Sequence, residues 1–279
     1  MKKIIIAGGG HAGVEAALAI AKLGCKAIIV TMDKSAIARM SCNPAIGGLG
    51  KGHLVKEIDA LGGIMGIAAD KCGIQFKTLN KSKGRAVWSP RAQIDKKKYS
   101  DFIHTAISNT NNIHILEDEV VDFSVDNSIV NGAYLKSSGY ISTSGIIVCS
   151  GTFMNGLIHM GNTKYSAGRL GEKAINNLSN TLINKGFIVS RLKTGTPPRL
   201  HSESIAWHKL KEASGDAKPY PFSFLTARPF VPDNVPCYIV DTNHDVHSML
   251  LKHLSESAMY SGNIEGIGPR YCPSIEDKV

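Results

Sequence analysis

The sequence predicts an α/β protein whose first domain has a Rossmann-like, dinucleotide-binding fold. Three consecutive features indicate it: an apolar run at residues 4–7 (IIIA), a glycine-rich turn at residues 8–13 (GGGHAG), and a helical, Ala/Leu-rich segment at residues 14–23. The glycines at 8, 10 and 13 have the G-x-G-x-x-G spacing of a strand-turn-helix that binds a pyrophosphate. Because glycine-rich turns also occur for purely structural reasons, a plain β-α-β unit remains the alternative.

Each glycine of this turn has its own expected role. Gly8 makes the tight turn, Gly10 lets a pyrophosphate approach the backbone, and Gly13 lets the helix pack on the strand. The N–H groups that open the helix then face the phosphates. A second buried strand is expected at residues 27–30, and Asp33 lies about 20 residues past the last glycine, where a ribose-binding acid belongs. Thr31, and not an acid, stands at the strand end itself.

Composition indicates a globular protein in a reducing compartment. The 279 residues suffice for one large domain or two, and 43% of them are hydrophobic. No apolar run approaches the ~20 residues of a membrane span, and the sequence begins without a signal-peptide pattern, so we expect a cytoplasmic protein with no membrane association. The six cysteines are scattered without metal-ligand spacing, which predicts neither a zinc site nor a disulfide framework.

Positive charge is concentrated in one segment. Residues 71–98 contain nine Lys or Arg residues and one acid, Asp95, interleaved with Phe76 and Trp88. Cations at this density could contact phosphates of a nucleic acid, and the aromatic rings could stack on unpaired bases. A solvated basic face is the alternative, and the sequence leaves both open. The cations proposed to bind are Lys81, Lys83, Arg85 and Arg91.

A second glycine-rich loop, residues 41–52 (SCNPAIGGLGKG), is expected to be irregular and shaped to fit something. It resembles a phosphate-binding Walker A loop only superficially, because Gly52 follows Lys51 where Ser or Thr is required. Further elements are expected in chain order: helices at 53–61, 92–109, 171–186 and 246–254, strands at 113–116, 146–149, 187–191 and 237–240, and a meander at 120–140 turning at Asn131-Gly132.

Four segments carry a resemblance to a known family. GGGHAGVEAA, SCNPAIGGLGKGHLVKEIDALGG, RLKTGTPPRL and GPRYCPSIEDKV occur in this order along the whole chain. Together they resemble the MnmG family, also called GidA, whose members are FAD-dependent enzymes that modify the wobble uridine of transfer RNA. The resemblance implies FAD, NADH and methylenetetrahydrofolate as the one-carbon donor. It also implies tRNA as substrate, the GTPase MnmE as partner, and a homodimer.

The resemblance also implies site residues. The backbone at Val120 is expected to contact the adenine, and the Ser150-Gly151-Thr152 turn to lie against the cofactor. The full set of expected cofactor-binding residues is Gly8, Gly9, Gly10, His11, Ala12, Gly13, Asp33, Val120, Ser150, Gly151, Thr152, Gly268, Pro269, Arg270 and Tyr271. Cys42 and Cys272 are the expected catalytic thiols, since both lie in Gly/Pro-rich loops near a cation in sequence rather than on an apolar pattern.

We therefore expect a Rossmann-like FAD-binding domain over residues 1–200, and the start of an inserted α/β domain that binds NAD(H) over residues 201–279. Members of the family continue past the position of Val279, so the chain resembles a truncated or partial sequence. It is then either part of a working tRNA-modifying flavoenzyme or a non-catalytic remnant that keeps some FAD or RNA binding. A folate- and FAD-dependent tRNA methyltransferase is a weaker alternative, because the ending GPRYCPSIEDK argues against it.

Overall fold

The structure is a computed structural model and describes residues 1–262, 264, 275–276 and 279. The chain forms two compact units. The first consists of Met1–Ser150 and Glu212–Tyr238, and the second of Gly151–Lys211 and Ile239–Val279. The functional division into FAD-binding and NAD(H)-binding domains stays a prediction. Within the described residues, no helix combines the length and the apolar character that crossing a membrane would require.

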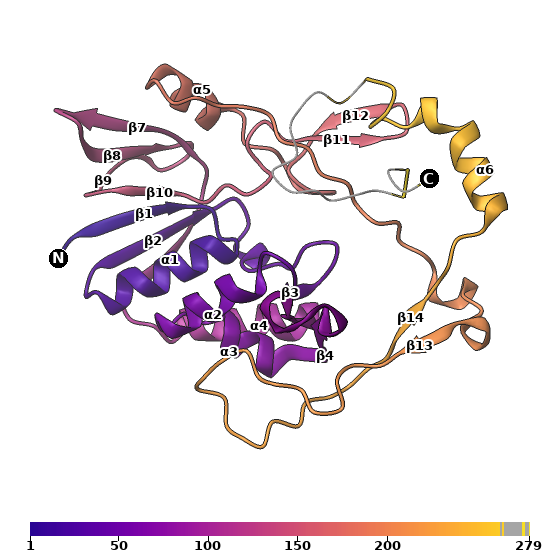
Figure 1. Ribbon diagram of the computed structural model, residues 1–279. Coiled ribbons are helices and arrows are strands. Elements are labelled where there is room, and N and C mark those ends of the chain that lie inside the picture. The colour runs from indigo at the N-terminus through magenta and orange to yellow at the C-terminus, as the bar shows by residue number, and fades with distance from the viewer. Residues whose placement is uncertain (263, 265–274, 277–278) are drawn as a thin grey trace. The chain divides into compact units, whose positions relative to one another are not determined.

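A four-stranded parallel sheet is the centre of the first unit (Figure 1). Its order is β10 (Ile146–Val148), β1 (Lys3–Ala7), β2 (Lys26–Thr31) and β6 (Ile113–Glu117). Helix α1 (His11–Lys22) connects β1 to β2 and lies along the sheet. Its buried side chains pack with the sheet in one hydrophobic core that includes the fully buried Ile6 and Ile29. The α/β fold expected from the first 33 residues is confirmed.

A smaller antiparallel sheet lies in the same unit, in the order β3 (Ala45–Gly47), β5 (Ser89–Ile94) and β4 (Gly73–Leu79). Helices α2 (Gly52–Ala60), α3 (Met65–Cys72) and α4 (Lys96–Ser108) accompany it. Two expectations were wrong here. Residues 45–47 of the second glycine-rich loop form a strand, because Ile46 is fully buried and pairs with Ala92. Residues 92–94 therefore belong to β5, and the helix expected from residue 92 begins only at Lys96.

The meander consists of β7 (Val120–Asp126), β8 (Ile129–Leu135) and β9 (Gly139–Ser142). Its first turn is at Asn127-Ser128, where both residues have positive φ (48° and 64°), the signature of a type I′ hairpin. The turn expected at Asn131-Gly132 was wrong, since Gly132 lies within β8. Gly132 is required for packing, because a Cβ on it would collide with the ring of Tyr140 on β9.

The returning segment, residues 212–238, packs against residues 1–150 of the first unit through buried polar groups. The buried amide of Gln75 donates from Nε2 to Ala213 O (3.1 Å) and Val235 O (2.9 Å). The Asp70 carboxylate accepts from Phe222 N (2.7 Å) and Ser223 N (2.9 Å). Strands β13 (Lys211–Ala213) and β14 (Cys237–Ile239) pair where the segment begins and ends. The segment is therefore a tethered part of the first unit.

The second unit contains the hairpin β11 (Leu157–Met160) and β12 (Thr163–Ser166), with helices α5 (Asn177–Asn184) and α6 (His244–Lys252). The helix expected at 171–186 is shorter, and the strand expected at 187–191 was wrong. Those residues have no regular structure, and Ile188 is fully exposed, because no strand in the described part of the chain pairs with them. An apolar run alone therefore did not define a strand.

Candidate functional site

The turn between β1 and α1 has the geometry that its glycines predict. Gly8 has φ +119° and donates from its N–H to Val30 O (2.9 Å), and a Cβ on it would collide with the carbonyl of Cys149. A Cβ on Gly13 would collide with the carbonyl of Gly8, so this glycine lets α1 pack closely on β1. Gly9 is also required by packing, since a Cβ there would lie 2.9 Å from Ile37 Cγ1.

Gly10 differs from the other three glycines, because a Cβ built on it meets no heavy atom of the described chain within 4 Å apart from Gly10 itself and its two chain neighbours. It is the N-cap of α1, and no side chain caps the helix there. The first helical bond runs from Val14 N to Gly10 O (3.0 Å), so the N–H groups of Ala12 and Gly13 keep their donor capacity at the turn. Open backbone at Gly10 and uncapped donors fit a phosphate group.

The imidazole of His11 packs against neighbouring side chains of the first unit. The ring stacks on Tyr99 of α4 with 5.4 Å between centroids, and Nε2 lies 3.1 Å from Met40 Sδ. Tyr99 is fully buried, and burial raises the pKa of its phenol. The side chain of His11 thus anchors the start of α1 to the core.

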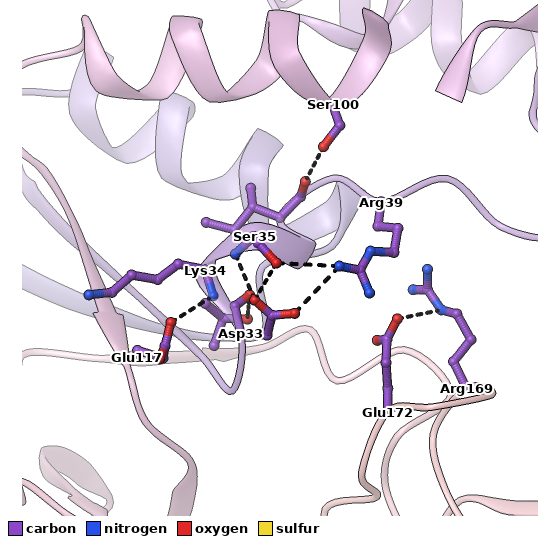
Figure 2. A network of polar contacts seen from close by, with 10 residues as sticks. Asp33, Lys34, Ser35, Arg39, Ser100, Glu117, Arg169 and Glu172 are labelled. Atoms are coloured by element: carbon purple, nitrogen blue, oxygen red, sulfur yellow. Dashed lines mark hydrogen bonds and ion pairs between the residues drawn. The ribbon is translucent and has the colours of Figure 1, made fainter. Parts of the chain in front are cut away.

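Asp33 follows β2 and caps a short 3-10 helix, η1 (Lys34–Ala36) (Figure 2). Its Oδ1 accepts from Ser35 N (2.8 Å) and Ser35 Oγ (2.6 Å), and Arg39 Nη2 lies 3.4 Å from Oδ2. The hydrogen bond from the Ser35 hydroxyl is the main cause that lowers the pKa of the Asp33 carboxyl, so it stays ionised. The carboxylate lies two residues past the end of β2 and already has these two protein partners.

The contacts of Ser35 and Arg39 with Asp33 were not predicted from the sequence. An Asp two residues before a Ser is a signal for a local cap, and it was available for Ser35. Two further contacts fix the region: Lys34 N donates to Glu117 Oε2 (3.1 Å) and Ser100 Oγ donates to Ile37 O (3.1 Å) (Figure 2). The same view draws an ion pair of the second unit, Arg169 Nε with Glu172 Oε1 at 3.7 Å.

Only some of the other residues expected to bind the cofactor lie near the glycine turn. Val120 begins β7 with its side chain buried and is paired with Leu135 of β8. Ser150 follows β10, and its N lies 3.4 Å from the position of a Cβ on Gly8, so it belongs to the neighbourhood of the turn. Gly151 and Thr152 begin the second unit, where Thr152 Oγ1 donates to Gly168 O (2.8 Å).

Cys42 is half-buried in the loop before β3. The loop is held by its own backbone: Ala45 N donates to Asn43 O (2.8 Å), and Gly48 N donates to Pro90 O (2.8 Å). Lys51 Nζ donates to Ala45 O (3.0 Å), so this ammonium braces the loop. The remaining expected residues, Gly268, Pro269, Arg270, Tyr271 and the second thiol Cys272, lie outside the described residues.

The predicted basic residues lie on and beside the β4–β5 hairpin. Lys81, Lys83 and Arg85 are exposed in its connecting loop, whereas Arg91 is half-buried on β5. Lys81 Nζ pairs with Asp216 Oδ1 at 2.8 Å. One of the four cations thus already serves to hold the returning segment.

A parallel β-α-β unit with a glycine turn that is open at Gly10 places the chain in the class of Rossmann-like α/β proteins. Comparison with known proteins narrows this class. The family described as "Glucose inhibited division protein A" matches residues 3–279, and the chain belongs to that family.

Similar proteins and solved structures support this family assignment. The chain is 48% identical over its whole length to "tRNA uridine 5-carboxymethylaminomethyl modification enzyme MnmG" of Chlorobium phaeobacteroides, and 49% identical over 99% of its length to the protein of that name from Thermodesulfovibrio yellowstonii. It covers 45% and 44% of those two proteins. The structure of GidA from Aquifex aeolicus matches with a TM-score of 0.91 and 46% identity, over 99% of this chain and 47% of that one. The chain thus spans less than half the length of these relatives.

Proposed function

We propose that this chain supplies the FAD-binding and RNA-contacting part of an enzyme that modifies a uridine of transfer RNA. The product is a wobble uridine carrying the 5-carboxymethylaminomethyl group. One observation carries the proposal: 48% identity along the entire chain to a protein named for this modification. The accessible backbone at Gly10 supports it independently, because it fits the pyrophosphate of a dinucleotide.

FAD is the cofactor that this turn would hold. The backbone of Gly8, Gly10 and Gly13 would receive the pyrophosphate, Asp33 the ribose, and the backbone at Val120 the adenine. Ser150, Gly151 and Thr152 complete this set in the proposal, with residues 268–271. When bound, the flavin supplies two-electron redox chemistry to the reaction. NADH as reductant and methylenetetrahydrofolate as one-carbon donor follow from the same family resemblance.

The two cysteines would act on the base. C5 of uracil is a poor nucleophile until a group adds at C6, and a thiolate is suited to that addition. We assign this role to Cys42 and Cys272 as a pair, one adding at C6 and the other assisting proton or one-carbon transfer. Cys42 lies half-buried in a backbone-braced loop, which supports a fixed position for its thiol.

The partners follow from the same proposal. They are transfer RNA, the GTPase MnmE and a second copy of the full-length protein, in the cytoplasm. A non-catalytic remnant that keeps FAD or RNA binding is the second candidate. A folate-dependent tRNA methyltransferase is a third, weaker candidate.

A chimera separates these candidates. Residues 1–279 of this chain replace the matching part of the Chlorobium relative in a bacterial strain that lacks its own enzyme, and modified nucleosides of transfer RNA are measured by mass spectrometry. We expect the 5-carboxymethylaminomethyl group to return. The Cys42→Ser chimera is the inactive control. A well-expressed chimera that binds FAD without restoring the nucleoside would favour the remnant, and 5-methyluridine in its place would favour the methyltransferase.

A further inference from the structure

We infer that residues 80–88, named here the hairpin loop, form a stacking site for unpaired nucleotides of an RNA, with the indole of Trp88 as the platform. The inference rests on the proposed function and deepens it, because it names the RNA feature that this part of the chain would contact. The contacts that support the stacking site do not involve the glycine turn around Gly10.

The hairpin loop has a fixed backbone. It joins β4 to β5 at the pair Leu79↔Ser89 and consists of two 3-10 turns, Lys81–Lys83 and Arg85–Val87. Asn80 (φ +59°) and Gly84 (φ +92°) provide the left-handed residues that begin each turn. Lys83 N donates to Asn80 O (2.9 Å), and Trp88 N donates to Arg85 O (3.2 Å). The loop can therefore present side chains in defined positions.

Trp88 is held by its edge and exposed on its ring. Its Nε1 donates to Lys81 O (3.2 Å), so the only polar group of the indole is satisfied within the loop. The residue is nevertheless 42% exposed. An exposed indole whose edge is held by a hydrogen bond is suited to stack on a nucleobase.

The charge around the indole indicates an anionic partner. No Asp or Glu occurs from residue 71 to residue 94. The Arg85 guanidinium lies over the indole, with 5.7 Å between its central carbon and the ring centroid. In the part of the chain that the structure describes, neither Lys83 nor Arg85 has an ion-pair partner. An indole with one such cation over its ring and another, Lys83, in the same loop suits a nucleotide, which offers a base and a phosphate together.

Unpaired nucleotides fit better than a duplex. The bases of a helix are stacked on one another and do not offer their faces, whereas bases in loops and bulges do. An acidic protein surface would use the cations but would not need the indole. The contributions of ring and charge can therefore be separated by experiment.

The chain contains only two tryptophans, so each can be observed alone by fluorescence. Trp207 is a matched control, being 44% exposed with its Nε1 donating to Ser202 O (3.1 Å). Trp207→Phe leaves Trp88 as the only emitter, and Trp88→Phe leaves Trp207. The 279-residue chain is titrated with a short RNA hairpin carrying an unpaired loop, and with a blunt duplex of the same stem. We expect the RNA hairpin to quench Trp88 strongly and Trp207 hardly at all, with little quenching by the duplex.

Affinities for the RNA hairpin are measured by anisotropy across a salt series. Trp88→Ala is expected to weaken binding roughly 5- to 150-fold without changing the salt slope, whereas Trp88→Phe retains most of the affinity. Lys83→Gln and Arg85→Gln are each expected to lower the slope by about 0.7 on single-stranded RNA. Lys136→Gln, which removes a cation paired with Glu119, and Trp207→Ala are the controls, with no change expected.

Several results would overturn the inference: no RNA binding by the wild-type chain, no quenching of Trp88 at saturation, or equal losses on RNA hairpin and duplex. The quenching experiment needs only the two Phe variants, so it decides even where Trp88→Ala fails to fold. The proposed function fails separately, when the chimera restores no modified nucleoside although Trp88 stacks on RNA. Conversely, a chimera that stays fully active with Trp88→Ala and shows no quenching overturns this inference alone.

Discussion

The ring of Phe222 packs on the backbone of Gly47, so closely that a Cβ at position 47 would lie 2.7 Å from Phe222 Cζ. Phe222 is 1% exposed and comes from the returning segment, whereas Gly47 ends β3, which directly follows the loop of Cys42. Lys56 of α2 reinforces this contact, since its Nζ donates to Pro221 O (2.7 Å) and Phe222 O (2.6 Å). The returning segment therefore supports the strand that anchors the Cys42 loop.

Phe222→Ala tests this support. Removing the buried ring is expected to destabilise the first unit by about 3–5 kcal/mol, because the cavity cannot be filled by neighbours that are held by backbone bonds. Phe224→Ala is the matched control, since Phe224 is 71% exposed two residues away, and a change below ~1 kcal/mol is expected. Urea unfolding followed by circular dichroism measures both. Equal stability of the two variants would contradict the packing role of Phe222.

The glycine turn gives a prediction that separates binding from folding. Gly10→Ala is expected to fold normally and to weaken FAD binding, because its Cβ meets no described protein atom but would project where the phosphate is expected. Gly13→Ala is expected to lose stability, because its Cβ collides with Gly8 O. Thermal unfolding and flavin fluorescence titration of both variants provide the measurements. Unchanged FAD affinity in folded Gly10→Ala would remove the phosphate site from this turn.

The hydrogen bonds to the Asp118 carboxylate predict that the free energy of unfolding depends on pH. Burial alone would raise the pKa of its carboxyl, but hydrogen bonds from Ser138 Oγ (2.7 Å), Glu119 N (2.8 Å), Ser138 N (2.8 Å) and Ser137 N (3.0 Å) outweigh it and hold the pKa below its usual 3.8. A lowered folded-state pKa contributes stability that is fully present above 3.8 and is lost as pH falls through the folded value.

Asp118→Asn should therefore lower stability at neutral pH and flatten the loss of stability at acid pH. Asp126→Asn, at the exposed end of β7, should leave the acid limb as in the wild type. Urea midpoints measured from pH 7 down to pH 2.5 test both variants. An acid limb of unchanged steepness in Asp118→Asn would show that other carboxylates control it.

Local patterns predicted the first unit well, and distant contacts explain the failures. The strand at 4–7, the turn at Gly8 and helix α1 follow from consecutive residues, so they were predictable. Strand β3 was not, because Ile46 pairs with Ala92, 46 positions along the chain. Asn131-Gly132 was mistaken for a turn because the reason for Gly132 is the ring of Tyr140 on the next strand. Near this turn, the position of Asp33 just after β2 was predictable from spacing, whereas the approach of Arg39 to its carboxylate was not.

The catalytic assignment of Cys42 and Cys272 gives the last prediction. In the chimera, Cys42→Ser and Cys272→Ser are each expected to keep FAD and bind transfer RNA, yet to lower the rate of uridine modification on the order of 10³-fold or more, because a hydroxyl cannot replace a thiolate nucleophile. Cys72→Ser is a control for general thiol loss at a buried position, where burial raises the pKa of the thiol to about 11 and so keeps it protonated and unreactive. It should alter stability rather than the rate per folded enzyme. Near wild-type modification in both Cys42→Ser and Cys272→Ser would mean that no thiolate from these positions adds to the base, and the nucleophile would then have to come from another residue or from the flavin itself.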